Sequence, residues 1–428
     1  MNYKESMCFI SSTYRFGIKL GLDNISELLF KLGNPGKKIK TLHIAGTNGK
    51  GSTSSFLSTI LIEAGYKVGL YTSPFLENFN ERIRIQNIPV SDEKIAKATT
   101  KVKEAIDKMM EEGFSCPSEF EIVTAVGFVI FEEEKVDYLV LEVGMGGSFD
   151  ATNVCTPIVS IITHIAMDHM QYLGETLGEI AFEKAGIIKK EIPVVISPQE
   201  KEAKDVLKAV AKEKEAEIFS VPSNYLNIES PILGEKFSCD TFKELGTIEI
   251  SLTGRHQIRN ALTAVTAIMA LRNNNLLKIT NEEVKKGLHK TEWAGRFEIV
   301  SKKPFVILDG AHNEDGWQVF RDTVERKLSG KKKTLVLGIL KDKEVDKALD
   351  ILLPLAESVI TIRPDNERAM SAKELCNKIL ERGVRSRAAN SIEETLSLAL
   401  KENADVILYV GSLYMIGAAR TMLGKKFK

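Results

Sequence analysis

Short apolar runs alternate with amphipathic or loop segments along the chain from residue 42 onward. This alternation is typical of βαβ units that surround a parallel sheet. It predicts strands at residues 42–44, 68–71, 138–143, 158–163 and 193–196. Helices are expected between the strands. One is predicted at residues 53–64, which Gly65 would end, and another at residues 119–133, whose long apolar face suits packing on a sheet.

The pattern changes after about residue 224, where short runs such as residues 247–252 predict antiparallel strands of a small added sheet. A helix with one apolar stripe is expected at residues 256–272. From residue 297 a second series predicts strands near 305–308, 334–337, 359–362 and 406–410. We therefore predict an α/β protein with two domains. Residues 1–296 would form a P-loop-type domain with a mostly parallel sheet and a small antiparallel addition, and residues 297–428 a Rossmann-like α/β domain.

Length and composition agree with this organisation and narrow the range of partners. A chain of 428 residues exceeds what one hydrophobic core usually supports. Lys plus Arg and Asp plus Glu number 58 each, so no net charge favours nucleic acid or a membrane as partner. We recognise no secretory signal and no membrane-spanning run, and five scattered cysteines fit neither a disulfide framework nor a thiolate zinc site. We expect a cytoplasmic protein.

A glycine-rich turn between the first strand and the next helix is the strongest chemical signal. Small residues let backbone N–H groups face a phosphate, the helix N-terminus adds positive potential, and a lysine supplies a mobile cation. The spacing departs from GxxxxGK[ST], because Ile44 replaces the first glycine and Gly51 the hydroxyl residue. A glycine-rich turn without a ligand is the alternative. After Gly46, the candidate ATP-binding residues are Thr47, Asn48, Gly49, Lys50, Gly51 and Ser52.

Gly51 stands where a standard phosphate-binding loop has the hydroxyl that ligates Mg²⁺, so the metal would need other oxygen or nitrogen ligands. We look for such ligands at the other strand ends. Ser73 follows the second strand, at the edge where ligands of open α/β sheets bind, although it could also begin a turn before Pro74. Glu142 is a lone carboxylate in an apolar strand, and its burial is costly unless it is paired or bound to a metal. For Glu142 we favour metal binding over a buried ion pair.

Other polar side chains near strand or helix ends leave two interpretations open. His164, Asp168 and His169 follow the strand at 158–163. A neutral imidazole can ligate a metal, but capping or core packing explains a lone histidine equally well. Lys184, near a helix end, is expected from the residues alone to be a solvated charge. Asp309 and His312 follow a strand and could hold a ribose diol and face phosphates, or the aspartate could cap a turn.

The order of the motifs resembles that of the folylpolyglutamate synthase family within the Mur ligase superfamily. The motifs are GTNGKGS, TSPFLENFNERI, LEVGMGGSFDATN, DHMQYLGETLGEIAFEKAGI, GRHQIRNA, WAGRFE, DGAHN and GSLY, and they span residues 41–415. The resemblance implies an ATP-dependent amide ligase that adds L-glutamate to the γ-carboxylate of a reduced folate through an acyl phosphate. It implies ATP, Mg²⁺ and a monovalent cation as cofactors, and we expect a monomer.

The resemblance also assigns roles to residues at matching motif positions. Ser73, Glu142 and His169 would hold Mg²⁺, in agreement with the search prompted by the displaced hydroxyl. Lys184 would be carbamylated, which reverses its interpretation as a solvated charge and makes it a catalytic candidate. The other implied roles are adenine-side contact by Asn260, phosphate contact by Arg296, ribose contact by Asp309 and a catalytic position in the cleft between domains for His312.

Two positions depart from the family pattern, since Ala294 and Glu314 stand where the family usually has proline; neither change removes a polar group of the motifs.

Three alternative functions stay open. The first is an enzyme that also adds glutamate to dihydropteroate, as some family members do. The second is a cell-wall Mur ligase with a UDP-linked substrate, which Gly51 and the TSP motif disfavour. The third is a P-loop NTPase regulator, which leaves the second α/β domain unexplained.

Overall fold

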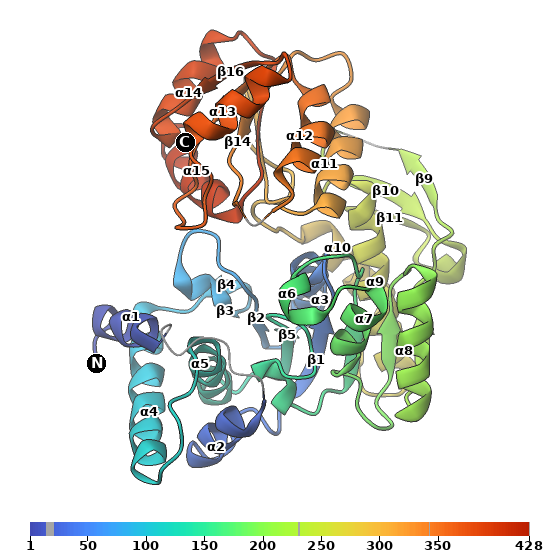
Figure 1. Ribbon diagram of the computed structural model, residues 1–428. Coiled ribbons are helices and arrows are strands. Elements are labelled where there is room, and N and C mark those ends of the chain that lie inside the picture. Colours follow the sequence, from blue (N-terminus) through green and yellow to red (C-terminus); the bar gives the residue numbers. More distant parts are fainter. Residues whose placement is uncertain (14–20, 230–231, 342, 428) are drawn as a thin grey trace. The chain divides into compact units, whose positions relative to one another are not determined.

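The computed structural model describes residues 1–13, 21–229, 232–341 and 343–427, and the chain divides into two compact units (Figure 1). The first unit comprises Met1–Leu226, Phe237–Glu249 and Ile258–Thr291. The second unit comprises Asn227–Lys236, Ile250–Gln257 and Glu292–Lys428. Two short segments around residues 227–257 thus belong to the second unit, although the sequence pattern groups them with the first.

An eight-stranded sheet is the centre of the first unit, with the strand order β4-β3-β2-β5-β1-β6-β7-β8. The strands from β2 to β8 in this order are parallel, and β3 and β4 continue the sheet in antiparallel fashion. All five strands predicted here are present within two residues of the expected bounds. The strands are β1 (Lys40–Ala45), β2 (Val68–Tyr71), β3 (Ile83–Ile85), β4 (Ile88–Pro89), β5 (Tyr138–Glu142), β6 (Val159–Ile162), β7 (Val194–Ile196) and β8 (Ile218–Ser220).

The strand order locates the binding edge of this sheet. The chain leaves β1 toward β2 on one side, whereas it leaves β6 toward β7 on the other side. The carboxyl ends of the adjacent strands β1 and β6 are therefore a topological switch point, the place where open α/β sheets bind ligands. The glycine-rich turn follows β1, and the segment with Asp168 and His169 follows β6.

Helices cover both faces of the first sheet. Since the crossovers from β1 to β2 and from β2 to β5 run in opposite directions, right-handed connections place α3 and α5 on opposite faces. The helix α5 has the predicted bounds, and Ser118 and Glu121 close its start as a capping box. The helical segments are α1 (Tyr3–Ser12), α2 (Asp23–Lys31), α3 (Lys50–Glu63), η2 (Phe79–Arg82), α4 (Asp92–Glu111), α5 (Glu119–Glu133), η3 (Ala151–Val154), α6 (Met170–Leu173), α7 (Leu177–Ala185), α8 (Lys201–Glu213), η4 (Asp240–Leu245), α9 (Arg255–Asn273) and α10 (Asn281–Lys290).

The small sheet predicted after residue 224 is present, with the order β11-β10-β9. Its strands are β9 (Leu226–Glu229), β10 (Glu235–Ser238) and β11 (Thr247–Ile250). In the second unit the Glu235 carboxylate accepts from the backbone N–H of Gly254 at 2.9 Å and pairs with Lys327 at 3.0 Å. Because both side chains of this ion pair are almost fully buried, the pair fixes the chain after β11 to the end of α11 (Glu314–Lys327).

A six-stranded sheet forms the second unit, with the order β12-β13-β17-β14-β15-β16. The strands are parallel apart from β12, which is antiparallel to β13. The predicted strands are present, and β12 and β16 are additional edge strands that the sequence pattern did not indicate. The elements are β12 (Glu298–Lys302), β13 (Phe305–Asp309), β14 (Lys333–Leu337), α12 (Val345–Leu352), η5 (Leu353–Leu355), β15 (Ser358–Thr361), α13 (Ala372–Glu381), β16 (Arg385–Ala388), α14 (Ile392–Lys401), β17 (Val406–Val410) and α15 (Leu413–Lys426).

The predicted fold class, an α/β protein with a mostly parallel first sheet and a second α/β sheet domain, is confirmed. Each unit has its own apolar core, and the core of the second unit contains the buried ring of Trp317. In the described ranges, we find no helix with the length and apolar character needed to cross a membrane.

Candidate functional site

The glycine-rich turn after β1 forms a tight loop whose backbone is tied to the end of β6. The carbonyl oxygen of His164 accepts from the N–H groups of Thr47 at 2.8 Å and Asn48 at 3.1 Å. These two N–H groups therefore shape the loop, and the ATP contact predicted for Thr47 and Asn48 stays a prediction. The first turn of α3 is suited to a phosphate, because the first N–H groups of a helix have no acceptor within that helix.

Glycine is required at two positions of this loop. Gly49 caps α3 with φ of 91°, and a Cβ atom there would lie 2.4 Å from Oδ1 of Asn260. Gly46 has φ of 149°, and a Cβ atom there would lie 1.9 Å from Oγ1 of Thr163. The loop thus packs so closely on α9 and on the end of β6 that no side chain fits. Asn260, predicted on the adenine side, lies buried beside the phosphate loop.

Two lysine side chains converge on one carbonyl oxygen of the loop. Lys50 begins α3, and its Nζ donates to the carbonyl of Gly46 at 3.0 Å and to that of Thr47 at 3.2 Å. Lys184 lies in the last turn of α7, and its Nζ donates to the same Gly46 carbonyl at 3.1 Å. The side-chain nitrogens of two lysines therefore share one acceptor, and the positive charge of Lys50 makes this end of the sheet attractive to an anion.

Lys184 is buried, with 4% of its surface exposed, so the residue-based interpretation as a solvated charge is wrong. Burial is the main cause that lowers the pKa of Lys184 to about 7, and the positive charge of Lys50 adds to it. Asp168, Asp150 and Glu183 act in the opposite direction. A large fraction of this amine is therefore neutral near neutral pH, unlike an ordinary lysine.

Two of the three predicted metal ligands lie at neighbouring strand ends. β2 and β5 are paired in parallel with Tyr71 opposite Leu141, so Ser73 and Glu142 leave the same edge of the sheet close together. Glu142 is buried, with 4% exposed, at the last position of β5. A hydroxyl and a carboxylate oxygen are donors that Mg²⁺ prefers, so this pair fits the metal.

His169 is the outlying member of the predicted ligand set. It follows β6, which lies beyond β1 from the strands that carry the other two ligands. It has φ of 51° and a side chain that is 51% exposed. In the described part of the chain, no three His, Cys, Asp or Glu side chains are grouped to hold a metal ion, and the predicted set contains only two residues of these types. Its role remains a prediction.

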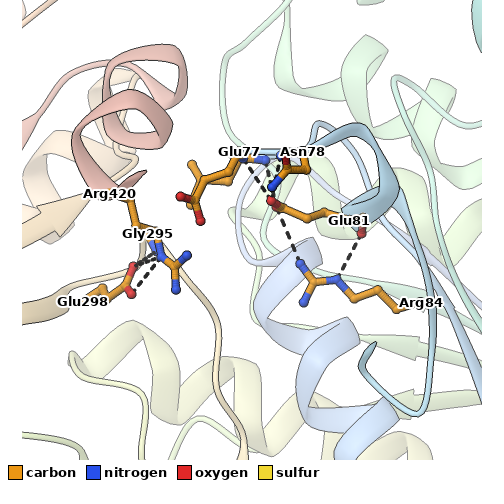
Figure 2. Close-up of polar contacts among 8 residues, drawn as sticks. Glu77, Asn78, Glu81, Arg84, Gly295, Glu298 and Arg420 are labelled. Atoms are coloured by element: carbon orange, nitrogen blue, oxygen red, sulfur yellow. Dashed lines mark hydrogen bonds and ion pairs between the residues drawn. The ribbon is translucent and has the colours of Figure 1, made fainter. Parts of the chain in front are cut away.

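The turn after Ser73 is held by a single carboxylate. Glu81 accepts from the backbone N–H groups of residues 76, 77 and 78 at 3.0, 3.0 and 2.9 Å (Figure 2). Asn78 and Glu81 also form a capping box around η2. The spacing Asn-x-x-Glu is a sequence signal for such a cap, and it could have identified Glu81 as the residue that shapes this turn.

The glycine-rich segment after Glu142 is fixed in a similar way by Asp150. This buried carboxylate accepts from the N–H groups of Met145 at 2.9 Å and Thr152 at 3.0 Å, and from the Thr152 hydroxyl. His43 contacts the same hydroxyl through Nε2 at 2.8 Å, and burial lowers the pKa of His43 to about 3. The network is therefore made with a neutral imidazole, and it ties the segment to β1.

In the second unit the predicted residue Arg296 lies in a turn with fixed ends. The N–H of Gly295 donates to the Glu298 carboxylate at 2.8 Å, and the guanidinium of Arg420 donates to the same carboxylate at 2.9 and 3.1 Å (Figure 2). On the other side, the carbonyl of Gly295 accepts from the N–H of Gly310 at 2.8 Å. The turn that carries Arg296 is thus fixed by α15 and by the end of β13.

Asp309 and His312 lie in the segment after β13 of the second unit. The two oxygens of Asp309 accept from the N–H groups of Phe297 at 2.9 Å and Ala311 at 2.8 Å. Burial raises the pKa of Asp309, and the nearby Arg296 opposes this shift. Nδ1 of His312 lies 2.8 Å from the carbonyl oxygen of Gly310. Asp309 therefore holds both the turn that carries Arg296 and the turn that follows β13. Its contact with a ribose remains a prediction.

Comparison with known families agrees with this geometry. A family model described as the Mur ligase middle domain matches residues 44–268, and one described as the Mur ligase glutamate ligase domain matches residues 295–413. The chain therefore belongs to the Mur ligase family. Within that family it belongs with the folylpolyglutamate and dihydrofolate synthases, on the similarity to the relatives described next. The resemblance inferred from the motifs is therefore confirmed.

Two similar proteins extend over the full length of the chain. The dihydrofolate synthase/folylpolyglutamate synthase of Bacillus subtilis (strain 168) is 38% identical, and the match covers 98% of this chain and 99% of the relative. The folylpolyglutamate synthase of Lacticaseibacillus casei is 35% identical, with 100% of both chains covered. A crystal structure of Mycobacterium tuberculosis folylpolyglutamate synthase complexed with ADP and AMPPCP is similar with a TM-score of 0.88 and 28% identity, and the match covers 99% of both chains.

The close packing of Gly49 leads to a specific prediction for the Gly49→Ala variant. A methyl group there would meet Asn260 and would also be held at a positive φ, so the start of α3 must shift away from its phosphate-binding position. We expect at least tenfold weaker binding of ADP, measured by isothermal titration calorimetry.

Gly65 is the matched control, because it follows the same helix with φ of 84° and no atom within 4 Å of a Cβ position. Gly65→Ala carries the same kind of backbone strain, about 1–2 kcal/mol, without the contact. It should lose stability but keep the ADP affinity. Equal ADP affinity of the two variants would contradict this account of the loop.

Proposed function

We propose that the protein is an ATP-dependent amide ligase that adds L-glutamate to the γ-carboxylate of a reduced folate. The observation that carries the proposal is the glycine-rich loop after β1, where Lys50 and Lys184 meet at one carbonyl oxygen beside the N-terminus of α3. Full-length similarity to folylpolyglutamate synthases supports the substrate class.

The proposed reaction has two chemical steps. The folate carboxylate oxygen attacks the γ-phosphorus of ATP, so that ADP leaves and an acyl phosphate forms. The amine of glutamate then attacks the acyl carbon, and inorganic phosphate leaves as the amide bond forms. Charge spreads over the phosphoryl oxygens in the first step, so catalysis depends on positioned positive groups rather than on a protein nucleophile. Lys50 and the N-terminus of α3 would provide these groups.

Mg²⁺ would neutralise charge on the phosphates, and Ser73, Glu142 and His169 would hold it. For the second unit we propose phosphate contact by Arg296 and ribose contact by Asp309, with His312 as a further catalytic candidate. Asn260 lies beside Gly49, which supports a nucleotide contact by its carboxamide. The fixed turns around Arg296 and Asp309 support their assignment, because residues that position a ligand must themselves be held in place.

We further propose that Lys184 is carbamylated. Its neutral amine can attack carbon dioxide: the nitrogen forms a bond to carbon, a proton leaves, and a carbamate anion results. The carbamate keeps one N–H group that can still donate to Gly46. Its negative charge would replace the repulsion from Lys50 with an attraction, which offsets part of the cost of burying the new anion.

A second activity, addition of glutamate to dihydropteroate, is supported by the similarity to the dihydrofolate synthase/folylpolyglutamate synthase of Bacillus subtilis. One experiment tests both activities. The purified protein is incubated with ATP, Mg²⁺, glutamate and either a reduced folate or dihydropteroate, and the products are analysed by mass spectrometry. Mass steps of one glutamyl unit on the folate are expected. Hydrolysis of ATP without any glutamylated product would contradict the proposed function.

Glu142→Gln tests the proposed metal site. The substitution preserves size but removes the charge that would balance Mg²⁺, so we expect turnover to fall by at least a hundredfold, as loss of transition-state charge stabilisation does in other enzymes. Turnover is measured over a series of Mg²⁺ concentrations, and circular dichroism checks the fold. Glu134→Gln is the control, because that carboxylate pairs with surface lysines. Full activity of Glu142→Gln would contradict the metal assignment.

Carbamylation of Lys184 should increase with pH. Because its pKa in the folded protein is lowered to about 7, the reactive neutral amine increases as the pH rises through this value and is lost below it. We expect the carbamate signal of ¹³C-bicarbonate in NMR spectra to grow from about pH 6 to pH 8. Lys184→Met should remove the signal, and Lys190→Met, at an exposed lysine, should not. A signal that survives Lys184→Met would place the modification elsewhere.

A further inference from the structure

A glutamine between β7 and α8 makes two main-chain hydrogen bonds beside the phosphate loop. Nε2 of Gln199 donates to the carbonyl of Thr163 at 2.7 Å, and Oε1 accepts from the N–H of Ile165 at 2.9 Å. These two residues flank His164, whose carbonyl holds the loop. Building on the proposed function, we propose that Gln199 is a positioning residue that fixes the phosphate loop for nucleotide binding.

The sheet itself explains why a side chain is needed at this place. The N–H of Ser197 donates to the carbonyl of Ile162 at 2.9 Å, directly after the last residue of β7. Beyond it the chain turns away into α8, which begins at Lys201, while the β6 side continues toward His164. The carboxamide of Gln199 supplies one donor and one acceptor, as a strand residue would. Gln199 thus extends the pairing of β6 past the end of β7.

The fixed segment determines the shape of the loop through further contacts. The His164 carbonyl accepts from the N–H groups of Thr47 and Asn48, as described above. The Thr47 hydroxyl donates to the carbonyl of Ala166 at 3.0 Å and accepts from its N–H at 3.1 Å. Residues 47 and 48 therefore follow the position of residues 164–166. A shift of that segment would move Gly49 and the start of α3, where we place the phosphates.

Thr163 adds a steric reason for this dependence. Its hydroxyl donates to the carbonyl of Ala45 at 3.2 Å, and it occupies the space where a side chain at position 46 would lie. The carbonyl of the same Thr163 is the group that Gln199 holds. One glutamine therefore acts on the residue that limits the loop at Gly46 and on the residue after His164. Both contacts are to main-chain groups of the segment that holds the loop, so the role we propose for Gln199 is exerted through the loop.

The Gln199→Met variant tests this inference, because methionine is similar in length but lacks both polar groups. We expect about tenfold weaker binding of ADP in isothermal titration calorimetry, since two hydrogen bonds that shape the loop are lost. Gln199→Glu keeps the oxygen that accepts from Ile165 and loses the donor to Thr163, so it should also weaken binding. The thermal unfolding temperature of each variant is recorded alongside.

Gln86→Met is the matched control. Oε1 of Gln86 accepts from the N–H of Val68 at 2.7 Å at the amino end of β2, which is the opposite edge of the same sheet. This variant should bind ADP like the unsubstituted protein. A double-mutant cycle with Thr47→Val measures whether the two substitutions act on the ADP affinity independently. If Gln199 only stabilised the fold, their effects on this affinity would be independent. If Gln199 acts through the loop, the effects of Gln199→Met and Thr47→Val on the ADP affinity are not additive.

The possible outcomes separate the two proposals. If the unsubstituted protein binds ADP and both Gln199 variants bind it equally well, the positioning role is wrong and the proposed function stands. Additive effects in the cycle, or loss of the folded state in both Gln199 variants but not in Gln86→Met, would also overturn the positioning role. If the unsubstituted protein binds no ADP, the proposed function itself fails and the inference fails with it.

Discussion

The carbonyl oxygen of Gly46 is the contact on which the site depends, because the side-chain nitrogens of two lysines donate to it. Lys50 comes from the helix after β1, and Lys184 comes from a helix 138 residues beyond Gly46 in the sequence. Bringing them together requires β1 and β6 to be adjacent and α7 to end against the loop. The repulsion between the two amines is relieved by a bound anion or by loss of one charge. The fold therefore favours either an anion at this point or a neutral Lys184.

Most segments around this contact are loops that follow strands, and individual side chains hold them in shape. Glu81 fixes the turn after β2, Asp150 the segment after β5, and Gln199 the segment after β6. Glu298 and Asp309 do the same in the second unit. In each case a carboxylate or carboxamide binds main-chain groups that no strand or helix satisfies. A loop held in this way can present ligand-binding groups without the entropic cost of ordering them on binding.

The sequence predicted the central strands of both large sheets because they are buried and apolar, whereas the short strands β3, β4, β8, β9 and β10 and the edge strand β12 were not predicted. The glycine-rich turn after β1 was recognised from its small residues and Lys50, and the structure adds that Gly46 and Gly49 have positive φ angles. The sequence could not predict β16, whose residues Arg385–Ala388 are mostly charged or small and lie at a sheet edge. It also placed Lys184 in solvent, because a lysine beside Glu183 near a helix end is usually exposed. In the structure the Lys184 amine donates to the backbone carbonyl of Gly46. Every residue has such a carbonyl, so the sequence does not indicate which one accepts from a lysine. For the same reason, nothing in the sequence indicated that His164 holds the loop through its main chain.

The register of the first sheet explains how the site can do without a hydroxyl directly after Lys50. Ile44 of β1 lies opposite Glu142 of β5, so the carboxylate is level with the start of the phosphate loop, one strand away. Side chains alternate along a strand, so a slip of one residue would turn Glu142 toward the α5 core and turn Leu139 and Leu141 out of that core. The parallel pairing of β1 and β5 therefore determines on which face this carboxylate lies. The neighbouring strand thus places a carboxylate, a ligand type that Mg²⁺ prefers, beside a loop that has glycine where the hydroxyl is expected.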